Sequence, residues 1–576
     1  MKYISKVKYL CMAAAVAGLT GCGDFGDLNI DPEHLNEGNV PYAMLFTNAQ
    51  HQALGSDWDV WRAGLIYTAQ WNQHIASGGW TWDYGVNSYS DGYAASYWES
   101  VYSGTRGAVR DVTTCVNKWK DDEDNKQNYE IARIMRVYIM NRLTDLYGDV
   151  PYFQAGQPEV YSYPVYDKQE DIYKDMLAQL DSAQAELGTG TASMGVKDIY
   201  YQGDVAKWKK FANSLMLRLA MRLVKADPST AKTYAEKAYN NGCITSTSDN
   251  CYLSHPGGSV NDDSSEPFAK ICSFSDIGVN FINQTFYDIL AERQDPRIPL
   301  IMCVVDNNVM AAYGTDAYTT GNADPAIQKG LPGFYSFTPT SDYCITKYPA
   351  GADFGDGKAY SLAESDDNYF KKCFSIPNRL TYADPTAPTF VCTAAQTNLL
   401  LAEAALRGYI GGDAATFYRE GIRCAMEQFS AYPNATSLIN KYLTDAEINA
   451  YIAAHPLNTT STETAMKDIN IQYYITCFGD EYETWANWRR SGYPELTYHA
   501  LDQSPDLGNY IGLVRRLTYP SRESTVNGTN YVEALKRQWN RTTDFTFTGD
   551  RVWWDKEENN TFFIKLNSFI IHAALV

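Results

Sequence analysis

The chain has 576 residues, of which 45% are hydrophobic, and its formal net charge at pH 7 is −20. A charge of this sign repels the phosphate backbone of nucleic acids, so the composition argues against nucleic acid as a partner and favours neutral ligands. The length is sufficient for more than one hydrophobic core or for one extended helical array.

The first 21 residues predict a secretory signal peptide. Three lysines among the first eight residues precede an apolar run that is too short to span a bilayer. The order Leu19-Thr20-Gly21-Cys22 resembles the lipobox of bacterial lipoproteins, in which the cysteine is lipidated and begins the mature chain. We therefore expect a lipid anchor on Cys22 and an extended tether over residues 22–40, which hold the protein on a membrane without spanning it. An unmodified cysteine after an ordinary signal peptide is the alternative.

Residues 41–250 are predicted to form an N-terminal helical part. Near its start, Trp58, Trp61, Tyr67 and Trp71 recur at helical spacing. Rings at such spacing share one face of a helix, and that face is usually the one that packs against the core. We therefore expect these four side chains to belong to the scaffold.

Within this part, residues 76–92 predict a loop rich in aromatic side chains. Its rings alternate with Gly, Ser, Asn and Asp, and no single helical face would bury all of them. Flat ring faces beside amides and carboxylates suit sugars, whose C–H faces stack and whose hydroxyls form hydrogen bonds. The same alternation is typical of a half-buried strand whose rings face inward, and the sequence leaves both interpretations open. The candidate ligand contacts are Trp80, Trp82, Tyr84, Asn87 and Tyr89.

Periodicity predicts several further helices. Residues 131–146 carry a one-faced apolar stripe. Residues 208–242 predict a helical hairpin in which Asp227 caps the second helix, and residues 399–429 predict another hairpin with small residues at the contact. Hairpins of about 34 residues with small residues at the contact resemble tetratricopeptide repeats.

The central stretch, residues 251–390, is dominated by Gly, Pro, Asp, Ser and Tyr and lacks a sustained helical period. We therefore expect an irregular, loop-rich insertion there. Residues 391–555 are predicted to form a C-terminal helical part, in which apolar positions from Ile471 to Trp485 predict one amphipathic helix. The tail, residues 556–576, is apolar but too short to span a bilayer, and the sequence does not say whether it packs as a strand.

No motif in the sequence predicts catalysis. The patterns of serine hydrolases, zinc proteases, P-loops and dinucleotide-binding sites are all missing. Ten of the twelve cysteines remain after signal cleavage and lipidation, and they form no C-x-x-C pair that would predict a zinc or redox site. We therefore predict no enzyme, no cofactor and no metal site. A pair of glycosidase carboxylates stays open, because its spacing is three-dimensional.

Six segments, in the same order, resemble motifs of SusD/RagB-type lipoproteins, the nutrient-binding outer-membrane proteins of Bacteroidetes. The clearest is LTDLYGDVPY at residues 143–152. A single short motif would be weak, but six in order together with a lipobox are specific. The other segments are residues 203–215, 295–297, 401–408, 488–492 and 515–520.

This resemblance implies a mostly α-helical fold. Tetratricopeptide-like helix pairs would form a right-handed superhelical scaffold, with the loop-rich insertion packed on it beside the ligand site. Motif residues such as Asp145, Arg218, Arg407 and Arg489 suit ion pairs or caps between helices, so we assign them no ligand role.

The resemblance also implies a role. It predicts a cell-surface glycan-binding lipoprotein of the outer membrane that captures oligosaccharides and delivers them to a SusC-like TonB-dependent transporter. Two alternatives stay open: a surface lipoprotein glycoside hydrolase, and a RagB-like protein that captures peptides.

Overall fold

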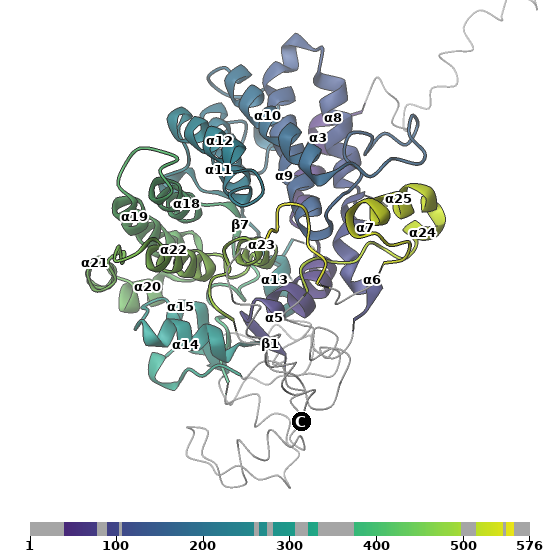
Figure 1. The fold of residues 1–576 in the computed structure, drawn as a ribbon. Coiled ribbons are helices and arrows are strands. Elements are labelled where there is room, and N and C mark those ends of the chain that lie inside the picture. Colours follow the sequence, from purple (N-terminus) through teal and green to yellow (C-terminus); the bar gives the residue numbers. More distant parts are fainter. Residues whose placement is uncertain are drawn as a thin grey trace, which may run out of the picture.

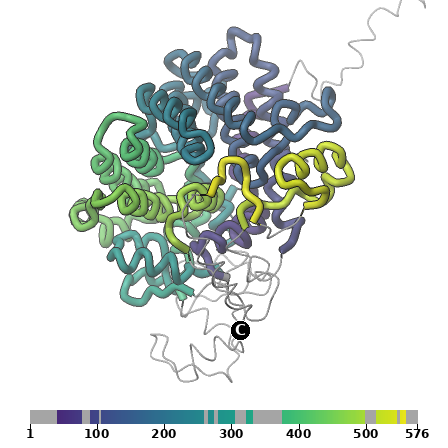
Figure 2. The backbone as a smooth tube through the Cα atoms, viewed as in Figure 1, coloured from purple at the N-terminus to yellow at the C-terminus, as the bar shows by residue number. Residues whose placement is uncertain are grey.

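The computed structural model describes residues 40–77, 89–102, 106–258, 264–272, 280–305, 321–331, 374–496, 514–544 and 549–557. The predicted signal peptide, almost all of the tether and the tail beyond residue 557 lie outside the described residues. Figure 1 shows a mostly helical molecule with a few short strands, and Figure 2 shows the same path as a tube. The predicted fold class is therefore confirmed.

The main body is an arc of helices in which each helix packs against the next. Helix α3 packs on α8, α8 on α9, α9 on α10 and α10 on α11, and the arc continues through α18 to α22. This serial packing is the tetratricopeptide-like superhelix. Its members are α3 (Tyr42–Ala53), α8 (Ala108–Trp119), α9 (Lys126–Tyr147), α10 (Gln169–Glu186), α11 (Val205–Arg222), α12 (Pro228–Asn241), α18 (Ala394–Leu406), α19 (Ala414–Glu427) and α22 (Thr462–Thr476).

Both predicted hairpins are confirmed, and local chemistry explains their ends. The side chain of Asp227 accepts a hydrogen bond from the backbone N–H of Thr230 at 3.0 Å, which caps α12. In the second hairpin, Thr393 and Gln396 form a reciprocal capping box at the start of α18. Asp413 caps α19 through two backbone N–H groups. The first backbone N–H groups of these helices therefore find hydrogen-bond acceptors within a few residues.

The prediction of a single helix from Ile471 to Trp485 is wrong. Helix α22 ends at Thr476, and a separate helix α23 (Glu481–Ser491) follows. The break contains Gly479, whose φ of +93° suits a residue without a Cβ atom. Apolar residues continue across the break because both helices bury their inner faces in the same core, so periodicity alone does not detect it.

The segment between α3 and α8 in the sequence forms several short elements. The side chain of Ser56 and that of Asp59 form a capping box that starts a continuous helical stretch, most of which is π-helical. The elements are α4 (Asp57–Asp59), η1 (Val60–Thr68), α5 (Ala69–Trp71), β1 (Ile75–Ser77), α6 (Asp91–Ala94) and α7 (Ser96–Tyr102).

The described part of residues 251–390 consists of short helices and strands. Strand β1 of the N-terminal part pairs antiparallel with β3, so Ile75 lies opposite Ile282 and the insertion is joined to the scaffold. Strand β4 lies between β5 and β6, and β2 pairs with β7. The elements are β2 (Cys251–Leu253), α13 (Pro267–Lys270), β3 (Asn280–Ile282), α14 (Gln284–Glu292), α15 (Ile298–Ile301), β4 (Met302–Val305), β5 (Gly321–Asn322), β6 (Ile376–Pro377) and β7 (Thr389–Cys392).

Further helices close the C-terminal side, and one core runs through the whole molecule. Its largest fully buried side chains include tryptophans and arginines, so charged groups are part of the interior. The eight cysteines within the described ranges are buried. None of the helices described here is both long and apolar enough to cross a membrane. The remaining helices are α20 (Thr436–Tyr442), α21 (Asp445–Ala454), α24 (Glu523–Val526) and α25 (Gly528–Trp539).

Candidate functional site

The aromatic residues before the predicted loop are mostly scaffold. Tyr67 and Trp71 are fully buried, and the ring of Trp71 lies 5.2 Å from that of Trp485. Trp61 is half-buried against the core. Trp58 differs, because half of it is exposed to solvent. The prediction of core packing is confirmed for Tyr67 and Trp71 and wrong for Trp58, which lies in the first turn of its helix.

The predicted ligand contacts fall mainly on residues that the structure does not describe. Trp80, Trp82, Tyr84 and Asn87 lie outside the described residues, and their ligand role stays a prediction. Tyr89 is described and is half-buried.

Tyr89 is bonded to a distant segment of the chain. Its hydroxyl accepts the backbone N–H of Thr518 at 3.0 Å and shares a second hydrogen bond with the Thr518 hydroxyl at 2.9 Å. Its ring lies 5.0 Å from that of Tyr67. Tyr89 thus joins the end of the aromatic stretch, the loop predicted over residues 76–92, to the scaffold. No local pattern in the sequence identifies Thr518 as its partner.

The start of the aromatic stretch is fixed by a small β-assembly. Beyond the β1–β3 pair, the backbone N–H of Leu331 donates to Ile282 O at 2.8 Å, and the N–H of Ile282 donates to Ser375 O at 2.8 Å. Strand β1 ends at Ser77 and α6 begins at Asp91, so the loop predicted over residues 76–92 is wrong at both ends by two residues. The aromatic stretch therefore begins where β3 of the insertion is joined to the scaffold.

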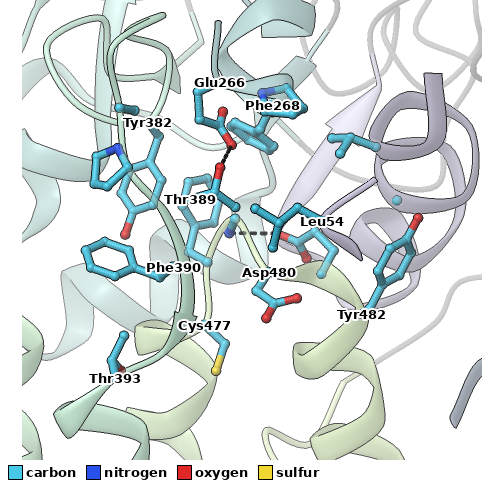
Figure 3. Close-up of a pocket in the computed structure, with 18 of the residues that line it drawn as sticks. Leu54, Glu266, Phe268, Tyr382, Thr389, Phe390, Thr393, Cys477, Asp480 and Tyr482 are labelled. Carbon is cyan, nitrogen blue, oxygen red and sulfur yellow. Dashed lines mark hydrogen bonds between the residues drawn. The ribbon is translucent and has the colours of Figure 1, made fainter. Parts of the chain in front are cut away.

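A cavity lies at the centre of the molecule, where the N-terminal part, the insertion and the turn between α22 and α23 meet. Figure 3 shows Tyr382 and Phe390 at the left, Glu266 and Phe268 at the top, and Tyr482 at the right. The cavity volume is about 70 Å³. One water needs roughly 10–15 Å³ of such space. The cavity therefore has room for a few waters and is small for an oligosaccharide.

Glu266 is the most unusual group of the cavity. It is 7% exposed, and its two carboxylate oxygens accept the Ala269 N–H at 2.7 Å and the Thr389 hydroxyl at 2.8 Å (Figure 3). Burial raises the pKa of Glu266 from 4.5 to about 7, and these two hydrogen bonds oppose the rise only in part. A buried carboxyl group therefore titrates close to neutral pH in this place.

Asp480 lies at another side of the same cavity. One of its oxygens pairs with the Arg142 guanidinium at 2.8 Å, whereas Oδ2 has no hydrogen-bond partner among the described residues. The Oε1 atom of Gln428, a buried residue of the cavity wall, also finds no partner in the part of the chain that the structure describes. Burial raises the pKa of Asp480, and Arg142 opposes it. The unpaired atoms are acceptors, so the cavity suits donors such as water.

Two motif residues, Asp145 and Arg489, form contacts between helices, as predicted. Asp145 of α9 lies 3.4 Å from Arg222 of α11 and accepts the indole N–H of Trp554 at 2.8 Å. Arg489 donates to the backbone oxygen of Asp145 at 2.8 Å.

Two further motif arginines also bond within the scaffold. Arg218 donates to the side chain of Gln396 at 2.9 Å, and Arg407 pairs with Glu403 at 2.9 Å. Arg218 thus joins α11 to α18, whereas Arg407 and Glu403 lie one turn apart at the end of α18. No group of three or more His, Cys, Asp and Glu side chains within the described ranges is arranged to hold a metal ion.

The helical arc, with an insertion joined to it beside an aromatic stretch, defines a tetratricopeptide-like binding scaffold. Within this class the chain belongs to the SusD-like family, whose sequence profile carries the description "Starch-binding associating with outer membrane" and matches residues 35–520. No curated protein matches the chain.

Several solved structures are similar to it. A chitin-binding protein is 28% identical, with a TM-score of 0.72 over 90% of this chain and 100% of the other. A Bacteroidetes SusD-like protein is 26% identical, with a TM-score of 0.74 over the same shares. A chitin-binding SusD homologue from Flavobacterium johnsoniae is 25% identical, with a TM-score of 0.66 over 90% and 99%.

Proposed function

We propose that this protein captures oligosaccharides at the cell surface and delivers them to a SusC-like TonB-dependent transporter in the outer membrane. The observation that carries the proposal is membership of the SusD-like family over residues 35–520. Two of the similar structures are chitin-binding proteins, so chito-oligosaccharides are the first ligands to test. The formal charge of −20 is compatible with neutral glycans.

The ligand contacts we propose are Trp80, Trp82, Tyr84 and Asn87. Ring faces would stack on the pyranose plane, and the amide of Asn87 would bind hydroxyl groups. The position of Ser77 at the end of β1 supports this assignment, because the aromatic stretch leaves the scaffold where the insertion is joined to it. Tyr89 fixes the other end of the stretch.

The test is calorimetry of the mature protein with chitohexaose and maltohexaose. Replacing both Trp80 and Trp82 by Ala should weaken glycan binding at least about tenfold, since aromatic stacking supplies much of the contact. Trp58→Ala is the matched control, because Trp58 is half exposed and lies on a scaffold helix outside the proposed contacts. Unchanged glycan affinity of the double variant would show that Trp80 and Trp82 do not belong to the binding site. Binding of peptides but not of glycans would overturn the glycan proposal.

The anchor and the transporter partner are tested separately. Lipidation of Cys22 predicts that the wild type, but not Cys22→Ala, incorporates a labelled fatty acid and sediments with membranes. A tagged wild-type chain should retain a TonB-dependent barrel from detergent-solubilised outer membranes. Failure to incorporate lipid contradicts the anchor, and failure to retain a barrel contradicts the partner.

A glycoside hydrolase is the second candidate, and Glu266 is the observation that favours it. A carboxyl group with a pKa of about 7 has the protonation behaviour of a general acid. Against this, both oxygens of Glu266 are occupied by Ala269 and Thr389, and the cavity of about 70 Å³ is small for a sugar pair. These features support binding without hydrolysis. Release of reducing sugar by the pure protein at saturating glycan, lost in Glu266→Gln, would establish the hydrolase instead.

A further inference from the structure

The connection between α9 and α10 is an ordered loop that closes on itself. The backbone N–H of Asp167 donates to Val150 O at 3.0 Å, so the two ends of residues 151–166 lie side by side. The Asp167 carboxylate then accepts the N–H groups of Tyr152 and Phe153, both at 2.9 Å. Such compact loops with joined ends are frequently functional.

Contacts with two other elements hold this loop in place. Gly156 packs so closely on α8 that a Cβ atom there would lie 2.8 Å from Val109 O. On the other side, Asn527 and Asn530 at the start of α25 donate to Pro164 O at 2.8 Å and Tyr163 O at 3.0 Å. The loop is therefore fixed by the scaffold rather than by its own outer side chains.

Those outer side chains are large, apolar and exposed. Of the nine large hydrophobic residues that are exposed within the described ranges, five lie in this one loop, and Val526 directly precedes the asparagine that holds it. Val160 and Tyr163 are each 69% exposed. A soluble surface seldom groups such residues unless another molecule covers them. The group, called here the 153–165 surface, consists of Phe153, Val160, Tyr161, Tyr163, Val165 and Val526.

The surface lies close to where the tether enters the described chain. Helix α8, which carries the loop through Val109, also packs on α3, and the thiol of Cys115 on α8 donates to Tyr42 O at 3.3 Å. Figure 1 shows α3 and α8 side by side. Residues 22–40 reach at most about 60 Å when extended. A lipid on Cys22 would thus leave this surface within reach of the membrane.

We propose that the 153–165 surface is where this lipoprotein docks on a membrane-embedded protein, the transporter barrel of the proposed function, on which this inference rests. Aromatic residues such as Phe and Tyr are enriched in protein interfaces. Between Tyr152 and Tyr166 the only charged residue is Glu159, so the loop has no lysine or arginine to attract anionic lipid. The chemistry therefore favours a protein surface over a lipid surface.

The experiment uses the full lipidated chain, tagged and expressed in its host. Outer membranes are solubilised, and the TonB-dependent barrel retained by each variant is identified and quantified by mass spectrometry. The triple variant Phe153→Ser, Val160→Ser and Tyr163→Ser should retain at least about tenfold less barrel than the wild type, because interface aromatics carry much of the binding energy. Val196→Ser is the matched control, since Val196 is 73% exposed and lies outside the loop.

Glycan affinity and the thermal unfolding midpoint of the triple variant are measured alongside. Both should match the wild type, because the substituted side chains face solvent. Equal barrel retention by the triple variant and the wild type overturns the surface assignment and leaves the proposed function intact. No barrel with the wild type overturns both the surface and the partner.

Two other occupants give different results. If vesicles of phosphatidylethanolamine and phosphatidylglycerol bind the Cys22→Ala protein, and the triple substitution abolishes this binding, the surface binds lipid. That result overturns the proposal. Dimers seen by light scattering that the triple substitution abolishes assign it to a second copy, with the same consequence.

Discussion

Replacing Glu266 by Gln tests the electrostatics of the central cavity. Glutamine has the same shape, so its oxygen can still accept the Ala269 N–H, and its amide can donate to the Thr389 hydroxyl. That hydroxyl would then turn its proton to His255, whose Nε2 lies 2.9 Å away. Burial lowers the pKa of His255 to about 4, so the ring is neutral and can accept. The substitution removes a charge and retains the hydrogen bonds.

The sign and size of the effect follow from the pKa of Glu266, which rises from 4.5 in the unfolded chain to about 7 in the folded one. Between these values the folded state binds more protons, so the stability contribution of Glu266 falls as pH rises through this window and is constant above it. A rise of this size corresponds to about 3 kcal/mol. Near pH 4.5 we expect wild type and Glu266→Gln to be similar, and at pH 8 the variant should be more stable by up to about 3 kcal/mol.

Thermal unfolding of the mature protein at pH 5, 6, 7 and 8 measures this difference. Unfolding entropy is roughly 0.9 kcal/mol/K for the 414 described residues, so the melting temperature of the variant should exceed that of the wild type by about 3 °C at pH 8. Glu170→Gln, an exposed acid that pairs with Lys174, should follow the wild type. A constant difference between wild type and Glu266→Gln at every pH would refute the reasoning.

Three further predictions concern the scaffold. Burial raises the pKa of Glu403, but Arg490 and Arg407 lower it more and hold it below its usual range. Glu403→Gln should therefore lower the free energy of unfolding at pH 7, measured with denaturant, by about 3–5 kcal/mol. A loss near zero contradicts a buried ion pair. Gly156→Ala should cost about 2 kcal/mol, because a Cβ would meet Val109 O at a φ of +77°; an unchanged melting temperature argues against this packing. The eight described cysteines are buried, so iodoacetamide should modify them only after unfolding, as peptide mapping will determine.

The parts of the fold that the sequence predicts are those fixed by local chemistry. Asp227, with Pro228 behind it, and Gly242 mark both ends of α12, and the structure places the helix between them. The loop-rich composition of residues 251–390 corresponds to short strands and helices in the described part. These features depend on a few neighbouring residues, so one sequence is sufficient to find them.

Other features depend on residues far apart in the chain, and the sequence does not predict them. The hydroxyl of Tyr89 finds its partner in Thr518, and β1 pairs with β3 across some 200 residues. The cavity around Glu266 needs three separate segments to form. Burial raises the pKa of Glu266 only because the tertiary fold excludes water there, which no local pattern records.

The segment that identifies the family is also the segment least suited to bind a ligand. In LTDLYGDVPY, the carboxylate of Asp145 is occupied by Arg222 and Trp554, and that of Asp149 accepts the N–H of Gln169 at 2.8 Å. Gly148 has no room for a side chain, since a Cβ would lie 2.5 Å from the Gln538 side chain. Both carboxylates of the segment are thus bonded within the scaffold. The motif therefore predicts the arc and its packing, and ligand choice must come from residues outside it.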